Sequence, residues 1–407
     1  MLNWTSGGVC APKGFTAAGV HAGVKASSSA DKKDLMLLFS EKPCAAWGMY
    51  TQNVVKAASV LWTRQALQNG AAQAVVANSG NANACCEQSG ENAERMARAA
   101  AEQLGIAPED VVVGSTGVIG QTINIAAIEQ ALPGCTEQLS RAGSDAAAQA
   151  IMTTDTVKKE EAVTVEIGGK TVTIGGISKG SGMIHPNMGT MLCFLVTDCA
   201  ISKELVRTAL QEAVRISFNR ISVDGDTSTN DTCVLMANGM AGNVEITEKG
   251  EAYALFVEAL SALCVKLARQ MARDGEGAKH LITCTVSGAR DEQSAETVAK
   301  SVIASSLTKT AVFGCDANWG RVLCAMGYSG ESFDPERVDV TFSSENGAVD
   351  VCRAGRGLPF DEALARQVLS AGEVVIAVSM GEGDGCCTCW GCDLTYDYVQ
   401  INGDYRT

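Results

Sequence analysis

Short apolar runs alternate with helix-like stretches along the whole chain. The apolar runs predict buried strands at residues 34–40, 74–77, 111–113, 191–196, 283–287, 338–342 and 374–378. The longer stretches predict helices at residues 57–69, 91–104, 125–132, 144–151, 202–217, 252–273, 295–306 and 360–371. Because strands and helices are mixed throughout, we expect an α/β (α+β) fold, a layered sandwich of sheets and helices.

The sequence predicts one hairpin clearly. Residues 162–167 and 171–174 are rich in strand-forming residues, and Gly168-Gly169 between them suits a tight two-residue turn. Residues 178–182 (SKGSG) then predict a flexible polar loop, which leads to the fully apolar strand at 191–196.

Composition narrows the class of protein. Hydrophobic residues make up 46% and charged residues 19% of the 407 residues, as in a compact globular protein with a large core. The formal net charge of −14 disfavours binding to nucleic acid, because like charges repel. No run approaches the roughly 18 apolar residues of a membrane-spanning helix, and residues 1–19 do not resemble a secretory signal. We therefore expect a cytoplasmic protein.

The 17 cysteines raise the question of metal or redox chemistry. Their number is odd and their spacing irregular, which favours reduced, buried cysteines over a disulfide framework. Cys386, Cys387, Cys389 and Cys392 lie close together, but their two C-x-x-C spacings share Cys389. We expect no metal or cofactor here, and a cysteine-rich metal-binding or redox protein without acyl chemistry is kept as an alternative.

Two further patterns suggest metal or triad chemistry at first sight. The run from Asp224 to Asp231 resembles a calcium loop, but its twelfth position is Leu235 instead of glutamate. We expect a tightly hydrogen-bonded loop near the active site, without metal. The three histidines, His21, His185 and His280, are too scattered to indicate a metal site or a Ser-His-Asp triad.

The stretch from Lys179 to Asp198 carries the most specific chemistry. Gly189 and Thr190 stand where a glycine-rich segment meets an apolar strand. A threonine hydroxyl can attack the carbonyl carbon that precedes it and shift the acyl group from nitrogen to oxygen; hydrolysis of that ester frees the threonine as a new N-terminus. Its α-amine, with an ordinary pKa of about 8, could then act as the base for the hydroxyl.

The same stretch resembles the self-processing site of the ornithine acetyltransferase family. It reads K-G-S-G-M-I from Lys179 to Ile184 and P-N-M-G-T-M-L from Pro186 to Leu192, with Gly189 where the family usually has Ala. Glycine is less hindered than alanine, so cleavage is still expected. Further resemblance covers nearly the whole chain, at residues 12–20, 76–83, 115–120, 152–156, 224–230, 274–278, 316–320, 390–398 and 402–407.

The resemblance implies a self-cleaving enzyme. Cleavage would give an α chain of residues 1–189 and a β chain of residues 190–407, assembled as α2β2 and processed like an N-terminal nucleophile enzyme. Thr190 would take the acetyl group of N2-acetylornithine, release ornithine and pass the acetyl group to glutamate by a ping-pong mechanism. Acetylation of glutamate from acetyl-CoA stays open as a second activity, and the resemblance implies no cofactor.

It also implies roles for individual residues. Thr116 and Gly117 would form the oxyanion hole, with Thr190 as nucleophile. The substrate would be bound by Thr190 and by five other residues, namely Thr153 (with Thr154 as the alternative), Lys179, Glu276, Asn402 and Thr407. Asn402 and Thr407 would require a docked C-terminal tail, for which Tyr396, Tyr398 and Tyr405 are candidate anchors.

A hydrolase with the same chemistry is the nearest alternative. In a self-processing amidase or aminopeptidase, water would resolve the acyl-enzyme in place of glutamate. Release of free acetate without an amino-acid acceptor would indicate this alternative.

Overall fold

A computed structural model describes residues 2–24, 29, 31–185 and 191–403. The chain divides into two compact units. Unit 1 comprises Met1–Gly180, Pro186–Asn219 and Thr227–Met271, and unit 2 comprises Ser181–His185, Arg220–Asp226 and Ala272–Thr407. This division differs from the expected cleavage point, because residues 181–185 belong to unit 2 while the strand that follows Thr190 belongs to unit 1.

Unit 1 is built on one large sheet with helices. Its elements are β1 (Asn3–Thr5), β2 (Phe15–Val20), β3 (Leu35–Tyr50), α1 (Ala58–Ala66), β4 (Ala71–Asn78), α2 (Ser89–Leu104), β5 (Val111–Ser115), α3 (Ile125–Glu137), α4 (Ser144–Ala150), β6 (Lys159–Ile167), β7 (Lys170–Lys179), β8 (Leu192–Thr197), α5 (Lys203–Arg215), β10 (Thr232–Ala237) and most of α6 (Glu251–Arg273). Among the described residues the strand order is β1-β6-β7-β8-β10-β3-β4-β5, with β2 also paired to β3.

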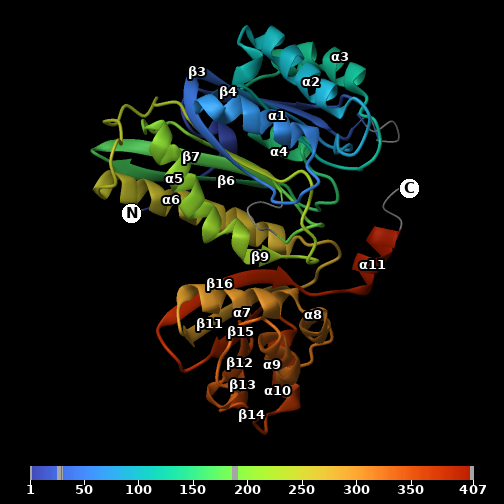
Figure 1. Cartoon of the computed structure of the whole chain (residues 1–407), viewed down its shortest axis with the longest axis vertical. Helices are drawn as coiled ribbons and strands as arrows, with labels where there is room; N and C mark the ends of the chain where they lie inside the picture. Colours follow the sequence, from blue (N-terminus) through green and yellow to red (C-terminus); the bar gives the residue numbers. More distant parts are fainter. Residues whose placement is uncertain (1, 25–28, 30, 186–190, 404–407) are drawn as a thin grey trace. The chain divides into compact units, whose positions relative to one another are not determined.

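The long strand β3 joins two parts of this sheet. Its first half pairs with β2 and its second half with β10, and its register against β4 shifts between Phe39 and Cys44. Alternate side chains of the first half enter different cores: Leu35 packs with α2 and α3, whereas Met36 packs with α4. Figure 1 shows α2 and α3 lying side by side over this part of the sheet.

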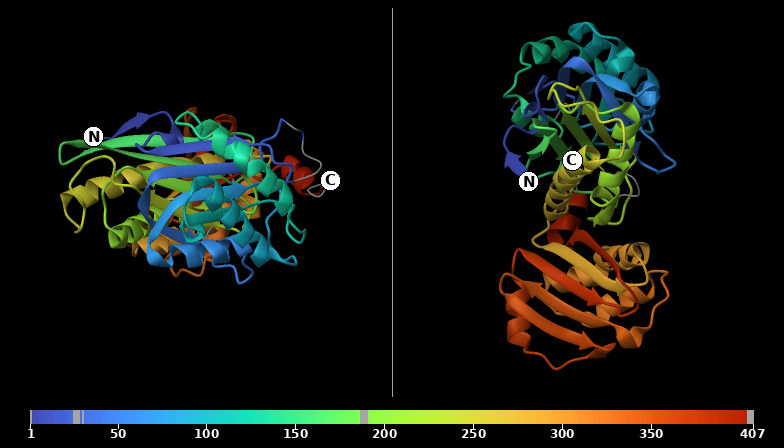
Figure 2. Two further views of the ribbon diagram at one scale, coloured as in Figure 1. Left: turned by 90° about the horizontal axis from the view of Figure 1, so that it is seen from above. Right: turned by 90° about the vertical axis from the view of Figure 1, so that its left-hand side faces the viewer.

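Unit 2 is a smaller layer of sheet and helices. Its elements are β9 (Ile221–Ser222), β11 (Leu281–Ala289), α7 (Glu292–Ala304), α8 (Ser306–Phe313), α9 (Trp319–Gly327), β12 (Asp339–Ser344), β13 (Gly347–Arg353), β14 (Arg356–Gly357), α10 (Glu362–Leu369), β15 (Glu373–Ser379), β16 (Gly385–Cys392) and α11 (Tyr396–Gly403). Its strands follow the order β14-β13-β12-β15-β11-β16-β9 among the described residues. Helices α7, α9 and α10 share one core with this sheet, whose strands Figure 2 shows side by side.

The expected α/β layering is confirmed, as is the hairpin. β6 and β7 pair antiparallel with Ile167 opposite Lys170, and Gly168 and Gly169 have positive φ angles of 59° and 72°. Two consecutive positive φ angles define the turn that such hairpins prefer. By contrast, the polar loop predicted at 178–182 begins later than expected, since only residues 180–182 lie outside a strand. β7 continues to Lys179, and Ser178, Lys179 and Ser181 are buried.

The cysteines behave as the composition suggested. Twelve of the 17 are buried, and all 17 are free thiols. In the 386–392 cluster the strand β16 explains the spacing, because Cys387 and Cys389 alternate into the core of unit 2 while Cys386 is exposed. Within the described residues, no three His, Cys, Asp or Glu side chains are grouped so that they could hold a metal ion.

Candidate functional site

The expected site residues fall into three groups. Thr116, Gly117, Thr153 and Lys179 belong to unit 1, and Glu276 and Asn402 belong to unit 2. Gly189, Thr190 and Thr407 lie outside the described residues, as does the candidate anchor Tyr405.

Thr116 and Gly117 form a turn at the end of β5. The Thr116 N–H donates to the Asn78 carbonyl over 3.0 Å, which continues the pairing of β5 with β4 by one residue. Gly117 has a φ of +133°, and a Cβ there would lie 2.3 Å from the Gly80 carbonyl carbon. Only glycine fits both the backbone angle and this close approach. The turn that presents Thr116 is thus held rigidly.

Asn230 fixes the same turn from another part of the chain. Its side-chain amide donates to the Ser115 carbonyl over 2.8 Å and to the Ala82 carbonyl over 2.7 Å. Asn230 belongs to the run that resembles a calcium loop, and it is buried. These hydrogen bonds tie the run to the turn after β5, as expected for a tightly hydrogen-bonded segment.

Lys179 meets Thr116 although the two residues are far apart in sequence. The Lys179 ammonium donates to the Thr116 hydroxyl over 3.4 Å, and both side chains are buried. Lys179 is the last residue of β7 and lies opposite Leu192, near the start of β8. A buried cation beside a hydroxyl can stabilise negative charge that develops on a bound substrate.

Asp155 is a buried carboxylate that sequence reasoning passed over. It pairs with the Lys159 ammonium over 2.7 Å, and both side chains are fully buried. Asp155 also accepts the N–H of Gly180 over 2.8 Å and that of Thr153 over 3.1 Å. Burial alone would raise the pKa of Asp155, but Lys179 and Lys159 together lower it to about 2. The carboxylate is therefore ionised at neutral pH, and it ties the backbone of Thr153 to that of Gly180, the residue after Lys179.

Asp231 is a second buried acid in unit 1. It precedes β10, and the N–H of its neighbour Thr232 donates to the Met191 carbonyl over 2.8 Å. Burial raises the pKa of Asp231 well above its usual range, against the opposing effects of Ser228 and Lys179. One carboxylate oxygen, Oδ2, is buried without a hydrogen-bond partner among the described residues. A single Asp within a polar run gave no sequence signal for this environment.

Glu276 in unit 2 is buried, and glycines at 182 and 277 allow close packing around its segment. A Cβ on Gly182 would lie 2.3 Å from the Glu276 carboxyl carbon, and a Cβ on Gly277 would lie 2.7 Å from the Tyr398 nitrogen. The Glu276 N–H donates to the Ser181 carbonyl over 2.9 Å. The glycine at 182 therefore leaves room for the buried Glu276 carboxyl group, and the glycine at 277 lets the following backbone pack closely against Asp397 and Tyr398 of α11.

Asn402 reaches Glu276 from the C-terminal helix α11. Its amide donates to Glu276 Oε2 over 2.7 Å and to the Tyr398 carbonyl over 3.1 Å. The described part of the tail is thus docked on unit 2, as Asn402 would require. Tyr396 packs edge-on against Phe313 with ring centroids 5.6 Å apart, but most of its side chain is exposed, so its role as an anchor stays a prediction.

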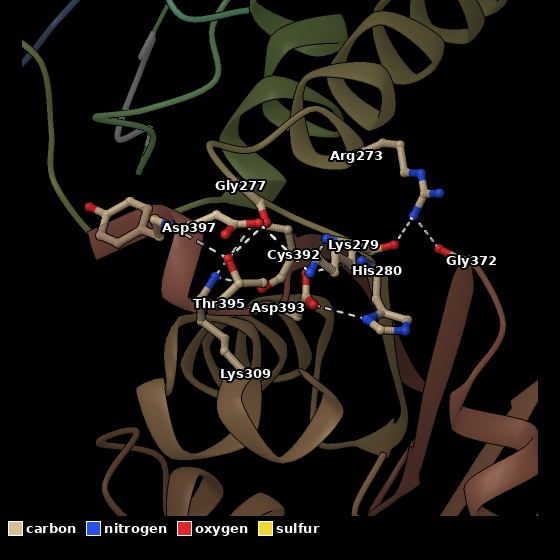
Figure 3. A network of polar contacts seen from close by, with 11 residues as sticks. Arg273, Gly277, Lys279, His280, Lys309, Gly372, Cys392, Asp393, Thr395 and Asp397 are labelled. Carbon is tan, nitrogen blue, oxygen red and sulfur yellow. Dashed lines mark hydrogen bonds and ion pairs between the residues drawn. The ribbon is translucent and has the colours of Figure 1, made fainter. Parts of the chain in front are cut away.

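Polar contacts hold the segment around Glu276 and the start of α11 together (Figure 3). The Asp393 carboxylate accepts the N–H groups of Lys279 and His280 and the His280 ring nitrogen Nδ1, over 2.8, 3.0 and 2.9 Å. The buried Lys309 ammonium donates to the carbonyls of Val223 and Cys392, each over 2.6 Å. These bonds fix the segment that follows Glu276 and the end of β16, which leads to α11.

Thr395 links Gly277, the residue after Glu276, directly to the start of α11. Its hydroxyl donates to the Gly277 carbonyl over 2.8 Å and accepts the Tyr398 N–H over 3.3 Å, which caps the first turn of α11. We predict that Thr395→Val lowers the free energy of unfolding by about 1–2 kcal/mol, whereas Thr395→Ser retains most of it. Thermal unfolding of the three proteins measures the difference. Equal midpoints for the valine and serine variants would show that the hydroxyl contributes nothing.

None of the helices in the described parts of the chain combines the length and the apolar character needed to span a bilayer.

Comparison with known proteins identifies relatives along the full length. The sequence pattern of the ArgJ family matches residues 16–407. The arginine biosynthesis bifunctional protein ArgJ of Symbiobacterium thermophilum is 53% identical over 407 residues, which span all of both chains. The protein of the same name from Bacillus subtilis is 46% identical over 404 residues, 99% of this chain and 97% of that protein.

Solved structures of similar proteins cover parts of the chain. That of the arginine biosynthesis bifunctional protein argJ from Bacillus halodurans is 44% identical and covers 52% of this chain and 97% of its own, with a TM-score of 0.49. That of ornithine acetyltransferase complexed with ornithine from Mycobacterium tuberculosis is 39% identical and covers 46% of this chain and 100% of its own, with a TM-score of 0.43.

The similarity to the curated relatives extends over every motif on which the resemblance was based. It confirms the family and, with it, the acyltransferase class that those motifs implied. The chain belongs to the ArgJ family of arginine-biosynthesis enzymes.

Proposed function

We propose that the chain cleaves itself between Gly189 and Thr190 and then moves the acetyl group of N2-acetylornithine to glutamate. In the first stage the Thr190 hydroxyl attacks the Gly189 carbonyl carbon, and the C–N bond breaks as the ester forms. Water hydrolyses the ester and leaves a free carboxylate on Gly189 and a free amine on Thr190. The Gly189 side of the bond is unhindered, because glycine has no Cβ.

In the second stage the Thr190 hydroxyl attacks the acetyl carbonyl of N2-acetylornithine. The Thr190 amine accepts the hydroxyl proton and passes a proton to the departing nitrogen, so that ornithine leaves and acetyl-threonine remains. The α-amine of glutamate then attacks the acetyl group, and N-acetylglutamate leaves. Each attack places negative charge on the acetyl oxygen, which the Thr116 hydroxyl and the Gly117 N–H would stabilise.

One observation carries this proposal: the buried contact between Lys179 and Thr116. Both residues belong to motifs that suggested the function, they are 63 positions apart, and they meet at 3.4 Å. A cation and a hydroxyl at one point suit a substrate with a carboxylate and a developing oxyanion. Lys179 and Thr153 would bind the substrate carboxylate, and Glu276, Asn402 and Thr407 would recognise the ornithine side.

The fold is compatible with a cut chain. β8, which begins two residues after Thr190, lies in the sheet between β7 and β10 and pairs with both. Hydrogen bonds of the sheet would therefore keep the α and β chains together after cleavage. We further propose assembly into α2β2 in the cytoplasm, with no cofactor, and with acetyl-CoA as a possible second acetyl donor.

Steady-state kinetics test the transfer. With purified protein, N2-acetylornithine and glutamate are varied together, and the two-step scheme predicts parallel lines in double-reciprocal plots. Free acetate is measured in parallel in the absence of glutamate. Intersecting lines would contradict an acetyl-enzyme intermediate, and stoichiometric acetate release without glutamate would instead indicate the hydrolase.

A further inference from the structure

Lys179 and Asp155 are buried close to one turn of the chain. The Lys179 ammonium faces the Thr116 hydroxyl, and the Asp155 carboxylate accepts the N–H of Gly180, the residue that follows Lys179. Lys179 ends β7 and Thr116 directly follows β5, and these two strands are widely separated in the strand order of the sheet. Their meeting is therefore a product of the fold and not of local sequence.

The direction of the hydrogen bond to Thr116 has a chemical consequence. A hydroxyl has one proton to donate and lone pairs to accept. Because an ammonium can only donate, the Thr116 oxygen accepts from Lys179, and its own proton stays available for another acceptor. A cation behind the oxygen also makes that proton a stronger donor. This is the arrangement that an oxyanion donor requires.

Asp155 is not available to Lys179 alone, because the Asp155 carboxylate also pairs with Lys159. Lys159 pairs with the Asp155 carboxylate over 2.7 Å, at a point where neither side chain is exposed. Because Lys159 shares the Asp155 carboxylate, the Lys179 ammonium that faces Thr116 can favour a developing oxyanion more than it could as the sole partner of Asp155.

We propose that Asp155, neutralised by Lys159, is a positioning residue that fixes Lys179 against Thr116, and that Lys179 assists catalysis by directing the Thr116 proton toward the oxyanion. This inference rests on the proposed function, since it assigns a partner to the proposed oxyanion hole. It predicts that Lys179 and Thr116 act as one unit in the rate of acetyl transfer.

A double-mutant cycle tests the link between Lys179 and Thr116. The rates of Lys179→Met, Thr116→Ala and the double variant are measured per mole of cleaved chain, with N2-acetylornithine and glutamate. We expect Lys179→Met to lower kcat about 10- to 100-fold in the wild-type background and less than about threefold when Thr116 is already Ala. Equal losses in the two backgrounds would overturn the link, because a lysine that binds only the substrate carboxylate acts independently of Thr116.

A second pair of variants tests Asp155. We expect Asp155→Asn to lower kcat about tenfold or more while KM for glutamate changes less. Because this variant leaves Lys159 buried without its charge partner and could fold poorly, Asp155→Asn/Lys159→Met removes both charges together. A normal thermal midpoint with a reduced kcat in this double variant supports the proposal. A normal midpoint with wild-type kcat overturns it.

The chain offers a matched control for these substitutions. Asp145 pairs with Lys158 in the same unit, but this pair is exposed, and its further hydrogen bonds are to Gln149 and Glu160, which are not expected site residues. Asp145→Asn should therefore leave kcat unchanged, and an equal loss in this control would overturn the specific role of Asp155. If the wild-type enzyme transferred no acetyl group at all, the proposed function itself would fail, which is a different outcome from a wild-type rate in the Asp155 variants.

Discussion

Replacing Thr190 with alanine is expected to leave the protein as a single chain of 42.3 kDa and to remove acetyl transfer entirely. Alanine has no hydroxyl, so it can neither attack the Gly189 carbonyl nor accept an acetyl group. Both stages of the proposed chemistry depend on this one oxygen. Intact-mass measurement gives the chain length, and an assay with N2-acetylornithine and glutamate gives the rate.

Two variants at the same junction separate the hydroxyl from the backbone. Thr190→Ser keeps a hydroxyl, and we expect the chain to be cut and active. Gly189→Ala restores the residue usual in the resembling family, and cleavage should again occur. A cut and active Thr190→Ala protein would contradict the proposed nucleophile.

Replacing Thr116 with alanine is expected to lower kcat about 10²–10³-fold, the usual cost of losing one oxyanion donor. The turn itself should persist, because the Thr116 N–H, the Gly117 conformation and the Asn230 contacts do not involve the Thr116 hydroxyl. The rate is measured per mole of Thr190-terminated chain, since incomplete cleavage would otherwise lower it as well.

Thr116→Ser is the matched control, because serine keeps a hydroxyl at nearly the same position. We expect it to retain most of the activity. If the alanine and serine variants had equal rates, the hydroxyl would have no part in stabilising the oxyanion.

The long, regular elements could be predicted from sequence, because their patterns are local. The apolar run of residues 191–196 corresponds to β8, and the alanine-rich stretch of 91–104 to α2. The paired glycines at 168 and 169 located the turn of the β6–β7 hairpin, since only a turn with two positive φ angles uses both.

Other elements depend on contacts that a local pattern does not contain. The strand predicted at 34–40 continues through exposed Glu41, Lys42 and Pro43 to Tyr50, because a register shift against β4 accommodates that polar segment. β16 consists mainly of Gly, Cys and Thr, and its strand form follows from pairing with β11 and β9. Lys179 is buried as the last residue of β7, paired with Leu192 of β8, although its glycine-rich surroundings suggested a loop. Ser181 is buried where its carbonyl accepts the Glu276 N–H.

The candidate site likewise contains some residues that the sequence predicts and others that it does not. Motifs identified Thr116, Lys179, Glu276 and Asn402, and the structure brings Lys179 to Thr116 and Asn402 to Glu276. The residues that support them could not be selected from sequence. Asp155 differs from other acidic residues only through burial with Lys159, and Thr395 differs from other threonines only through its bonds to Gly277 and Tyr398.

The central claim is an acetyl group carried on Thr190, and mass spectrometry tests it most directly. The purified protein is incubated with N2-acetylornithine in the absence of glutamate, quenched in acid and mapped by peptides. The account predicts fragments 1–189 and 190–407, with one acetyl group on the peptide that begins at Thr190 and its loss when glutamate is added. A fully active chain that is uncut at Gly189–Thr190, or an acetyl group that transfers from a different residue, would contradict it.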